Sequence, residues 1–263
     1  MEEIDLEINF KDKVVVITGA EGGIGSEMVR KFAEGGAKVA ICDLRCKGEL
    51  EKELCEKGYD VQTFSFNITD REETAKAMKN IADTFGRVDI LINNAGINVG
   101  PEERKTIEDF SDKWWDAINE VDLSGVFCCS KAAIPYMTGD NASIINVSSI
   151  VGIVPLRNQC AFAAAKAGVI NLSKAMAMEL APKGIRVNVV APGTVGIEIT
   201  NELWKENSAM EGLLSHIPMA RQAKPSEIAN AAMFLGSELA TYITGVVLPV
   251  DGGWTCGGFA RDF

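Results

Sequence analysis

The sequence predicts an α/β fold in which β-strands and amphipathic helices alternate around a parallel sheet. Short β-branched runs recur along nearly the whole chain, and longer stretches with helical periodicity separate them. The length of 263 residues and the 47% hydrophobic content are enough to bury one large core. We therefore expect consecutive βαβ units within one domain that spans residues 1–263.

Seven segments have the apolar, β-branched composition of buried parallel strands. They are residues 14–17, 38–42, 61–66, 89–92, 143–147, 186–190 and 246–250.

The helices between these strands carry recognisable start and stop signals. After the first strand, one helical face gathers Ile24, Met28, Val29, Phe32 and Ala33, and Gly35 and Gly36 end the helix. Thr69 and Asp70 are expected to cap the third helix, and Pro225 is expected to begin the last one.

Residues 197–221 form a connection that is longer than the others. We interpret this stretch as a candidate substrate lid. A pair of ordinary surface helices explains its apolar residues equally well.

Charge and composition exclude several classes of function. The net charge of −11 argues against a nucleic-acid partner and favours a small molecule. The acidic start and the lack of any run of roughly 18 apolar residues predict neither a secretory signal nor a membrane span, so we expect a cytoplasmic protein. Seven cysteines without a CxxC pair and a single histidine, His216, predict no metal site.

A glycine-rich turn follows the first predicted strand and leads into a helix. In TGAEGGIG (18–25), Gly19 permits a tight turn, and Gly23 and Gly25 allow a pyrophosphate to approach the helix start. Asp43 stands at the end of the second strand, where a carboxylate can bind an adenosine ribose and repel a 2′-phosphate. This arrangement favours NAD over NADP, although Arg45 could instead turn toward a phosphate.

From residue 11 to residue 253 the sequence resembles the short-chain dehydrogenase/reductase family. TGAEGGIG (18–25), NNAG (93–96), RVNVVAPG (186–193) and VDGG (250–253) are similar to four motifs of that family. The resemblance implies a doubly wound Rossmann fold with about seven parallel strands and helices on both faces. It also implies hydride transfer between a nicotinamide cofactor and a carbonyl or alcohol, and a homotetramer.

The resemblance further implies a set of cofactor-binding residues. They are Gly19, Glu21, Gly23, Ile24, Gly25, Asp43, Leu44, Asn67, Ile68, Asn94, Ala95, Gly96, Lys166, Pro192, Gly193, Val195 and Ile197. The family often has threonine where this chain has Ile197, and an Asp-Val pair where it has Asn67 and Ile68.

In this family a serine, a tyrosine thirteen residues later, a lysine four residues after the tyrosine, and an earlier asparagine carry the chemistry. Ser149 and Lys166 match. The tyrosine position holds Phe162, and the asparagine position holds Asp122. The i, i+4 spacing places Phe162 and Lys166 on one helix face, where the ring could still lie beside the nicotinamide.

Phe162 lacks the ionisable proton that a phenol, with its pKa near ~10, would supply. Positioned acid–base catalysis contributes about 10²- to 10⁴-fold, so we expect a chain that binds cofactor and turns over poorly. Three explanations are open. The chain is a dehydrogenase whose tyrosine has been replaced by phenylalanine to trap a bound complex, a natural non-catalytic scaffold or sensor, or a natural enzyme that uses Ser149 or water as proton donor.

Asp122 changes the site more mildly. A carboxylate only accepts hydrogen bonds, whereas an amide also donates, so a water relay from Lys166 would need rearranging. Asp122 could equally pair with Lys166 or hold a backbone N–H.

Substrate-facing residues are expected in the loops that follow NNAG and the fifth strand. With Ser149, the candidates are Asn98, Ile150, Arg157 and Gln159. Their polarity favours a polyol, sugar or hydroxy acid over a steroid. The small residues around Phe162, such as Ala164 and Ala167, indicate a helix that another subunit can approach closely.

Overall fold

The computed structural model describes residues 8–139, 141–197, 211–212 and 214–257. Most of the candidate lid, residues 198–210 and 213, lies outside this part of the chain. The described strands form one seven-stranded sheet in the order β3-β2-β1-β4-β5-β6-β7, and every pair is parallel. The strands are β1 (Val14–Thr18), β2 (Lys38–Asp43), β3 (Val61–Ser65), β4 (Ile90–Asn93), β5 (Ala142–Val147), β6 (Ile185–Pro192) and β7 (Val247–Val250).

The predicted strands are confirmed, and the differences lie at their ends. The largest is in β6, which extends two residues beyond the predicted end at residue 190. It extends because Ala191 and Pro192 still pair with Pro249 and Val250 of β7.

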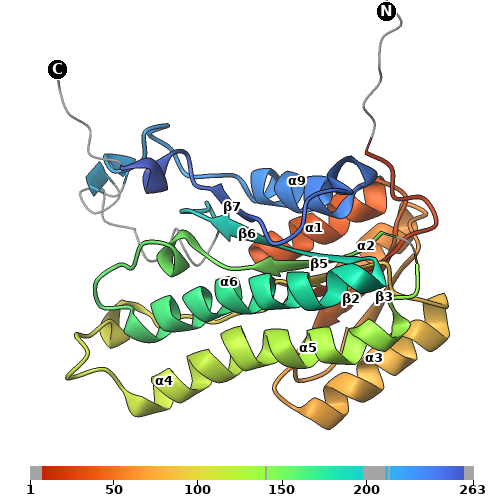
Figure 1. Cartoon of the computed structure of the whole chain (residues 1–263), viewed down its shortest axis with the longest axis horizontal. Helices are drawn as coiled ribbons and strands as arrows, with labels where there is room; N and C mark the ends of the chain where they lie inside the picture. Colours follow the sequence, from red (N-terminus) through yellow and green to blue (C-terminus); the bar gives the residue numbers. More distant parts are fainter. Residues whose placement is uncertain (1–7, 140, 198–210, 213, 258–263) are drawn as a thin grey trace, which may run out of the picture.

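Helices cover both faces of the sheet, as expected for a doubly wound fold (Figure 1). One face carries α1 (Gly23–Glu34), α2 (Glu49–Glu56) and α9 (Pro225–Gly236), and the other carries α3 (Arg71–Phe85), α5 (Gly125–Ala133) and α6 (Cys160–Leu180). Helix α4 (Asp112–Asn119) packs on α6. Within the described ranges, no helix is long and apolar enough to cross a membrane.

The sequences of the strands are nearly continuous runs of apolar residues, because both faces of the sheet are buried. Along β1, Val15 and Ile17 join the core beneath α1 and α9, and Val16 joins the core beneath α3, α5 and α6. This alternation follows from the two-residue period of a strand.

The ends of α1, α3 and α9 can be compared with the predicted start and stop residues. Gly35 directly follows α1, and Pro225 is the first residue of α9. Asp70 caps α3, since its Oδ1 accepts the N–H groups of Glu72 and Glu73 at 2.9 and 3.0 Å. The prediction that Thr69 shares this role is wrong, because its hydroxyl donates instead to Asn67 Oδ1 at 3.0 Å.

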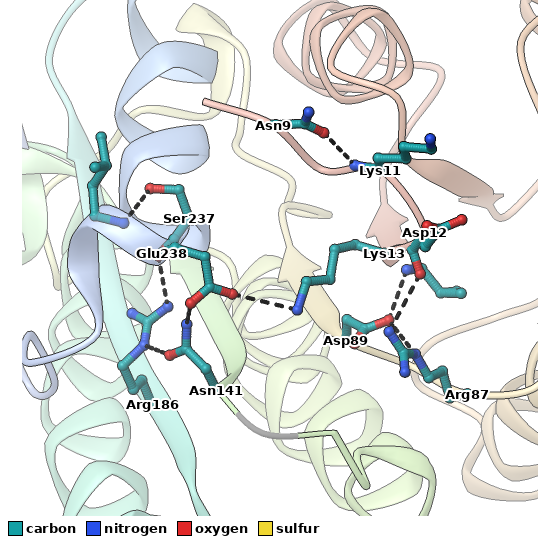
Figure 2. Close-up of polar contacts among 12 residues, drawn as sticks. Asn9, Lys11, Asp12, Lys13, Arg87, Asp89, Asn141, Arg186, Ser237 and Glu238 are labelled. Carbon is teal, nitrogen blue, oxygen red and sulfur yellow. Dashed lines mark hydrogen bonds and ion pairs between the residues drawn. The ribbon is translucent and has the colours of Figure 1, made fainter. Parts of the chain in front are cut away.

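A polar network ties the amino-terminal ends of the strands together (Figure 2). Arg186, buried at the start of β6, donates from Nε to Asn141 Oδ1 and from Nη1 to Leu235 O, each at 2.7 Å. Lys13 lies 3.4 Å from Glu238, whose second carboxylate oxygen accepts from Asn141. The network therefore joins the starts of β1 and β6 to the end of α9. It lies at the amino-terminal ends of the strands, opposite their carboxyl ends.

Candidate active site

The centre of the site is the crevice between β1 and β4, where the strand order reverses. The connection after β1 leads to one side of the sheet and the connection after β4 to the other, which opens a crevice at their carboxyl ends. Thr18, the last residue of β1, accepts the N–H groups of Asn94 and Ala95 on its Oγ1, both at 3.1 Å. Asn94 Nδ2 donates to Thr18 O and Gly19 O at 3.0 Å. The NNAG segment therefore holds the glycine turn in place.

The glycine turn has no room for side chains. Gly19 has φ +61°, and a Cβ there would lie 2.7 Å from Ala95 Cα. A Cβ on Gly25 would lie 2.1 Å from Gly19 O. Helix α1 begins at Gly23, and the N–H groups of a first helical turn attract an anion. Ile197 lies over this helix start, 2.7 Å from where a Gly23 Cβ would be, and Ile24 packs partly buried against the core.

Two carboxylates stand beside this turn: Glu21 from the loop after β1 and Asp43 from the last position of β2. Half-buried Asp43 accepts the Glu21 N–H on Oδ2 at 3.0 Å and the Leu44 N–H on Oδ1 at 2.8 Å. Glu21 Oε1 accepts the Lys47 N–H at 3.1 Å. A carboxylate has about four lone-pair sites, so Asp43 keeps the capacity to accept a ribose hydroxyl. Arg45 and Leu44 are exposed.

The cysteines that flank Asp43 are not activated nucleophiles. Burial raises the pKa of the Cys42 thiol well above its ordinary value, and it also raises the pKa of Cys46. Both side chains therefore remain neutral thiols near pH 7.

Asn67 and Ile68 follow β3 at the same sheet edge. Asn67 Oδ1 accepts the Thr69 N–H at 3.1 Å, which fixes the turn before α3. Ile68 packs against Gly125, where a Cβ would lie only 2.6 Å from Ile68 Cδ1.

The segment after β6 closes the other side of the crevice. Gly193 N–H donates to Val250 O at 2.9 Å, and a Cβ on Gly193 would lie 2.8 Å from Asp251 Cα. The RVNVVAPG and VDGG segments are therefore in direct contact in the fold. The side chain of Val195 is buried in the core, so a cofactor contact there would come from the backbone.

Helix α6 brings Phe162 and Lys166 together, and the loop after β5 that carries Ser149 is held against the same helix. The Lys166 ammonium lies 5.5 Å from the centroid of the Phe162 ring. Lys166 Nζ donates to Val147 O at 3.2 Å, and Ser148 Oγ donates to Lys166 O at 2.8 Å, so the end of β5 is fastened to this turn of α6. The Ser149 hydroxyl accepts the Val151 N–H at 3.2 Å, which leaves its own proton to donate.

Asp122 lies in a π-helical turn, Glu120–Ser124, between α4 and α5. Its Oδ1 accepts the Ile97 N–H at 2.7 Å, and its Oδ2 lies 3.0 Å from Lys166 Nζ. Both structural roles expected for Asp122 are therefore present together. Oδ2 makes no hydrogen bond of good geometry, so its attraction to the ammonium is mainly one of charge.

The bare Cα of Gly96 makes room for this ion pair. A Cβ there would lie 2.9 Å from Asp122 Oδ2 and 3.1 Å from Lys166 Nζ. Asp122 is 0% exposed and Lys166 is 5% exposed, so the pair is shielded from water.

The expected substrate residues divide into two groups. Asn98 Nδ2 donates to Gln159 Oε1 at 3.0 Å, and buried Gln159 directly precedes α6, so these two lie together near Phe162. Ile150 is buried beside Ser149. Arg157, in contrast, is exposed.

Sequence reasoning missed three residues that shape the site: Thr18, Ser148 and Gly152. A Cβ on Gly152 would lie 2.6 Å from the Lys166 carbonyl carbon, so this glycine lets the β5 loop approach α6. Thr18 is the first residue of the glycine motif, and Ser148 directly precedes Ser149. Their positions next to predicted site residues could have marked them as part of the site.

Comparison with known proteins agrees with this geometry. The family model described as "Enoyl-(Acyl carrier protein) reductase" matches residues 19–255. A 3-oxoacyl-[acyl-carrier-protein] reductase, FabG, from Thermotoga maritima is 39% identical over 249 residues, which cover 94% of this chain and 99% of the relative. The chain belongs to the short-chain dehydrogenase/reductase family.

Other short-chain dehydrogenases are similarly related. The cis-4-hydroxycyclohexanecarboxylate dehydrogenase of Sinomonas cyclohexanicum is 37% identical over 94% of this chain and 98% of the relative. Among solved structures, gox2181 has a TM-score of 0.91 at 30% identity and covers 95% of this chain and 98% of its own. A Pseudomonas aeruginosa RhlG/NADP active-site complex has a TM-score of 0.87 at 28% identity, covering 94% and 98%.

Proposed function

We propose that this chain is an NAD-linked oxidoreductase of secondary alcohols and ketones whose turnover is limited by Phe162. One observation carries the proposal: the Lys166 ammonium lies 5.5 Å from the Phe162 ring centroid, on the helix that hydrogen-bonds to Val147 and Ser148, directly before Ser149. Its spacing from Ser149 and Lys166 is the reason to assign position 162 to the family's proton donor. The bound nicotinamide would supply or accept the hydride.

The residues of this chain would share the remaining work. Ser149 would donate its hydroxyl proton to the substrate oxygen, and Lys166 would hold the nicotinamide ribose. The glycine turn and the start of α1 would hold the pyrophosphate. A residue that gives or takes the substrate proton is missing at position 162.

Restoring the phenol by Phe162→Tyr tests this role. We expect NAD⁺ reduction by a panel of secondary alcohols, measured near pH 10, to rise by about 10²- to 10⁴-fold. Phe162→Leu is the matched control and is expected to give no gain. Fast turnover by the unaltered chain would contradict the proposal and would favour Ser149 or water as proton donor. Tight NAD binding without turnover in any variant would favour the non-catalytic scaffold.

The two carboxylates support NAD as the cofactor. A 2′-phosphate beside Asp43 and Glu21 would place like charges together, which costs several kcal/mol. The relatives leave this choice open, since one similar structure is an NADP complex. We expect NAD⁺ to bind at least about tenfold more tightly than NADP⁺ in calorimetry.

Asp43→Ser should remove most of this preference. Asp60→Ser is the matched control, because Asp60 is exposed and pairs with Lys38 at 3.6 Å. Tighter binding of NADP⁺ by the unaltered chain would indicate that Arg45 receives the phosphate.

A hydroxy acid, polyol or sugar is the proposed substrate class. Asn98 and Gln159 provide amide groups near Phe162, and exposed Arg157 offers a cation for a carboxylate. The Sinomonas relative is named for a cyclic hydroxy acid, which supports this choice. The panel should therefore include cyclic hydroxy acids, polyols and a steroid alcohol. A preference for the steroid would contradict it.

A further inference from the structure

The charges around position 162 differ from those that a phenolic proton donor needs. Among the described residues, the Lys166 ammonium is the cation placed over the Phe162 ring, and Asp122 is the carboxylate paired with that ammonium. Phe162 also packs with a hydrophobic cluster, and the amides of Asn98 and Gln159 that lie near it are uncharged. The cluster comprises Ile97, Val99, Phe110, Trp114, Ile118, Ala161, Leu123 and Ala165.

We propose that Asp122 cancels the electrostatic support that Lys166 would give to a phenolate at position 162. The proposal deepens the proposed function and rests on it, because position 162 is taken as the place of the proton donor.

The physical argument concerns opposite charges in a shielded site. A cation within ~4–6 Å of an acid favours its ionised form and lowers its pKa by about 1–3 units, and an anion has the opposite effect. The Asp122 carboxylate is 3.0 Å from Lys166 Nζ, so at the ring the two charges act as a neutral pair. Their burial prevents solvent from screening either charge separately.

The carboxylate also cannot move away easily. The Ile97 N–H holds its Oδ1 at 2.7 Å, and the backbone of Gly96 lies against Oδ2. An asparagine at position 122 could keep the Ile97 contact and would leave the charge of Lys166 free to act on a phenol.

The test is the titration of a tyrosine introduced at position 162, followed by the ultraviolet absorbance of tyrosinate. The variants are Phe162→Tyr and Phe162→Tyr/Asp122→Asn, with the unaltered chain subtracted to remove Tyr59, Tyr136 and Tyr242. We expect the introduced phenol to titrate at or above ~9.5 in the single variant, near its ordinary ~10. In the double variant its pKa should fall by at least about 1 unit.

Turnover gives a second readout. In alcohol oxidation the bound nicotinamide cofactor would accept the hydride from the carbinol carbon, and the introduced phenolate would accept the hydroxyl proton, so that ketone, reduced cofactor and neutral tyrosine result. Below its pKa the phenolate fraction falls tenfold per pH unit. Near pH 8 the double variant should therefore oxidise alcohol at least about tenfold faster than Phe162→Tyr.

Controls separate this effect from structural damage. Asp116 is an exposed aspartate on α4, so Phe162→Tyr/Asp116→Asn should titrate like Phe162→Tyr. Circular dichroism reports whether each variant is folded. If the Asp122→Asn variants do not fold, the titration of Phe162→Tyr alone still tests the proposal. A pKa below ~9.5 for its introduced phenol overturns the proposal.

The titration and turnover results together distinguish failure of this proposal from failure of the proposed function. A lower phenol pKa in the double variant without turnover supports the role of Asp122 and contradicts the assignment of hydride transfer. Equal pKa values in the single and double variants overturn the role of Asp122, whatever the activity.

Discussion

At the scale of single residues, the account depends on Phe162, Lys166 and Asp122. The sequence predicted that Phe162 and Lys166 share a helix face, because i, i+4 spacing decides this locally. It left the partner of Asp122 open, because the pairing depends on how the turn at Glu120–Ser124 meets α6. Local spacing therefore predicted contacts within one helix but not contacts between elements.

Lys166→Met should be strongly destabilising. It would leave the Asp122 carboxylate buried without its cation, which costs about 3–5 kcal/mol in the free energy of unfolding. Urea denaturation measures this loss. Lys166→Met/Asp122→Leu should recover part of it, because no unpaired charge remains, although the Ile97 N–H then lacks its acceptor. A double variant no more stable than Lys166→Met would contradict the electrostatic explanation.

At the scale of elements, the π-helical turn is the feature that sequence reasoning could not predict. Such turns are inserted into helices frequently at functional sites, and here the turn directs Asp122 to the Ile97 N–H and the Lys166 ammonium. Nothing in EVDLS differs from an ordinary helix pattern. The strands and most caps were predictable because composition and end signals determine them within a few residues.

The start of α9 is expected to respond to acid. Glu227 contacts Arg221 through two hydrogen bonds of 2.7 Å and accepts the Lys224 N–H, and these bonds lower its pKa to about 2. A lowered carboxyl pKa contributes stability above the unfolded pKa of about 4.3, and this stability is lost as the pH falls toward 2. The Tm difference between the unaltered chain and Glu227→Gln should therefore be complete above pH ~4.5 and shrink at lower pH. A difference that is constant with pH would contradict this.

Arg186→Met should lower stability without affecting the site. The guanidinium donates to Asn141 (Figure 2). It also donates to the Leu235 carbonyl near the end of α9, and its loss would leave this buried carbonyl without that donor. We expect a loss of about 2–4 kcal/mol in the free energy of unfolding. NAD affinity of the folded fraction should be unchanged, because this network lies at the amino-terminal ends of the strands and the proposed cofactor site lies at their carboxyl ends. A selective loss of NAD binding would contradict that separation.

At the scale of the whole molecule, the strand order explains why distant motifs meet. The reversal between β1 and β4 brings TGAEGGIG and NNAG to one crevice, and the β6–β7 pairing brings the segment after Pro192 against VDGG. Alternating strands and helices predicted a parallel sheet. The doubly wound arrangement came only from the family resemblance, because composition and periodicity do not determine which strands pair.

The exposed face of α6 supports the proposal that the chain forms a homotetramer. Ala161 and Ala165 are buried beneath α4, whereas Ala164 and Ala167 remain exposed, with Met178 76% exposed further along the helix. Ala164→Arg should shift the molecule to a smaller species in light scattering coupled to size exclusion. Lys174→Arg on the same face is the control. A monomer in the unaltered chain would contradict the tetramer.

The most direct test of the central claim is a crystal structure of the chain with NAD⁺ and a secondary alcohol. The account predicts the pyrophosphate at the start of α1, Lys166 Nζ within ~3 Å of a nicotinamide ribose hydroxyl, and the alcohol oxygen between Ser149 Oγ and the Phe162 ring edge. A dinucleotide bound elsewhere, or a Phe162 ring directed away from both nicotinamide and Ser149, would contradict it.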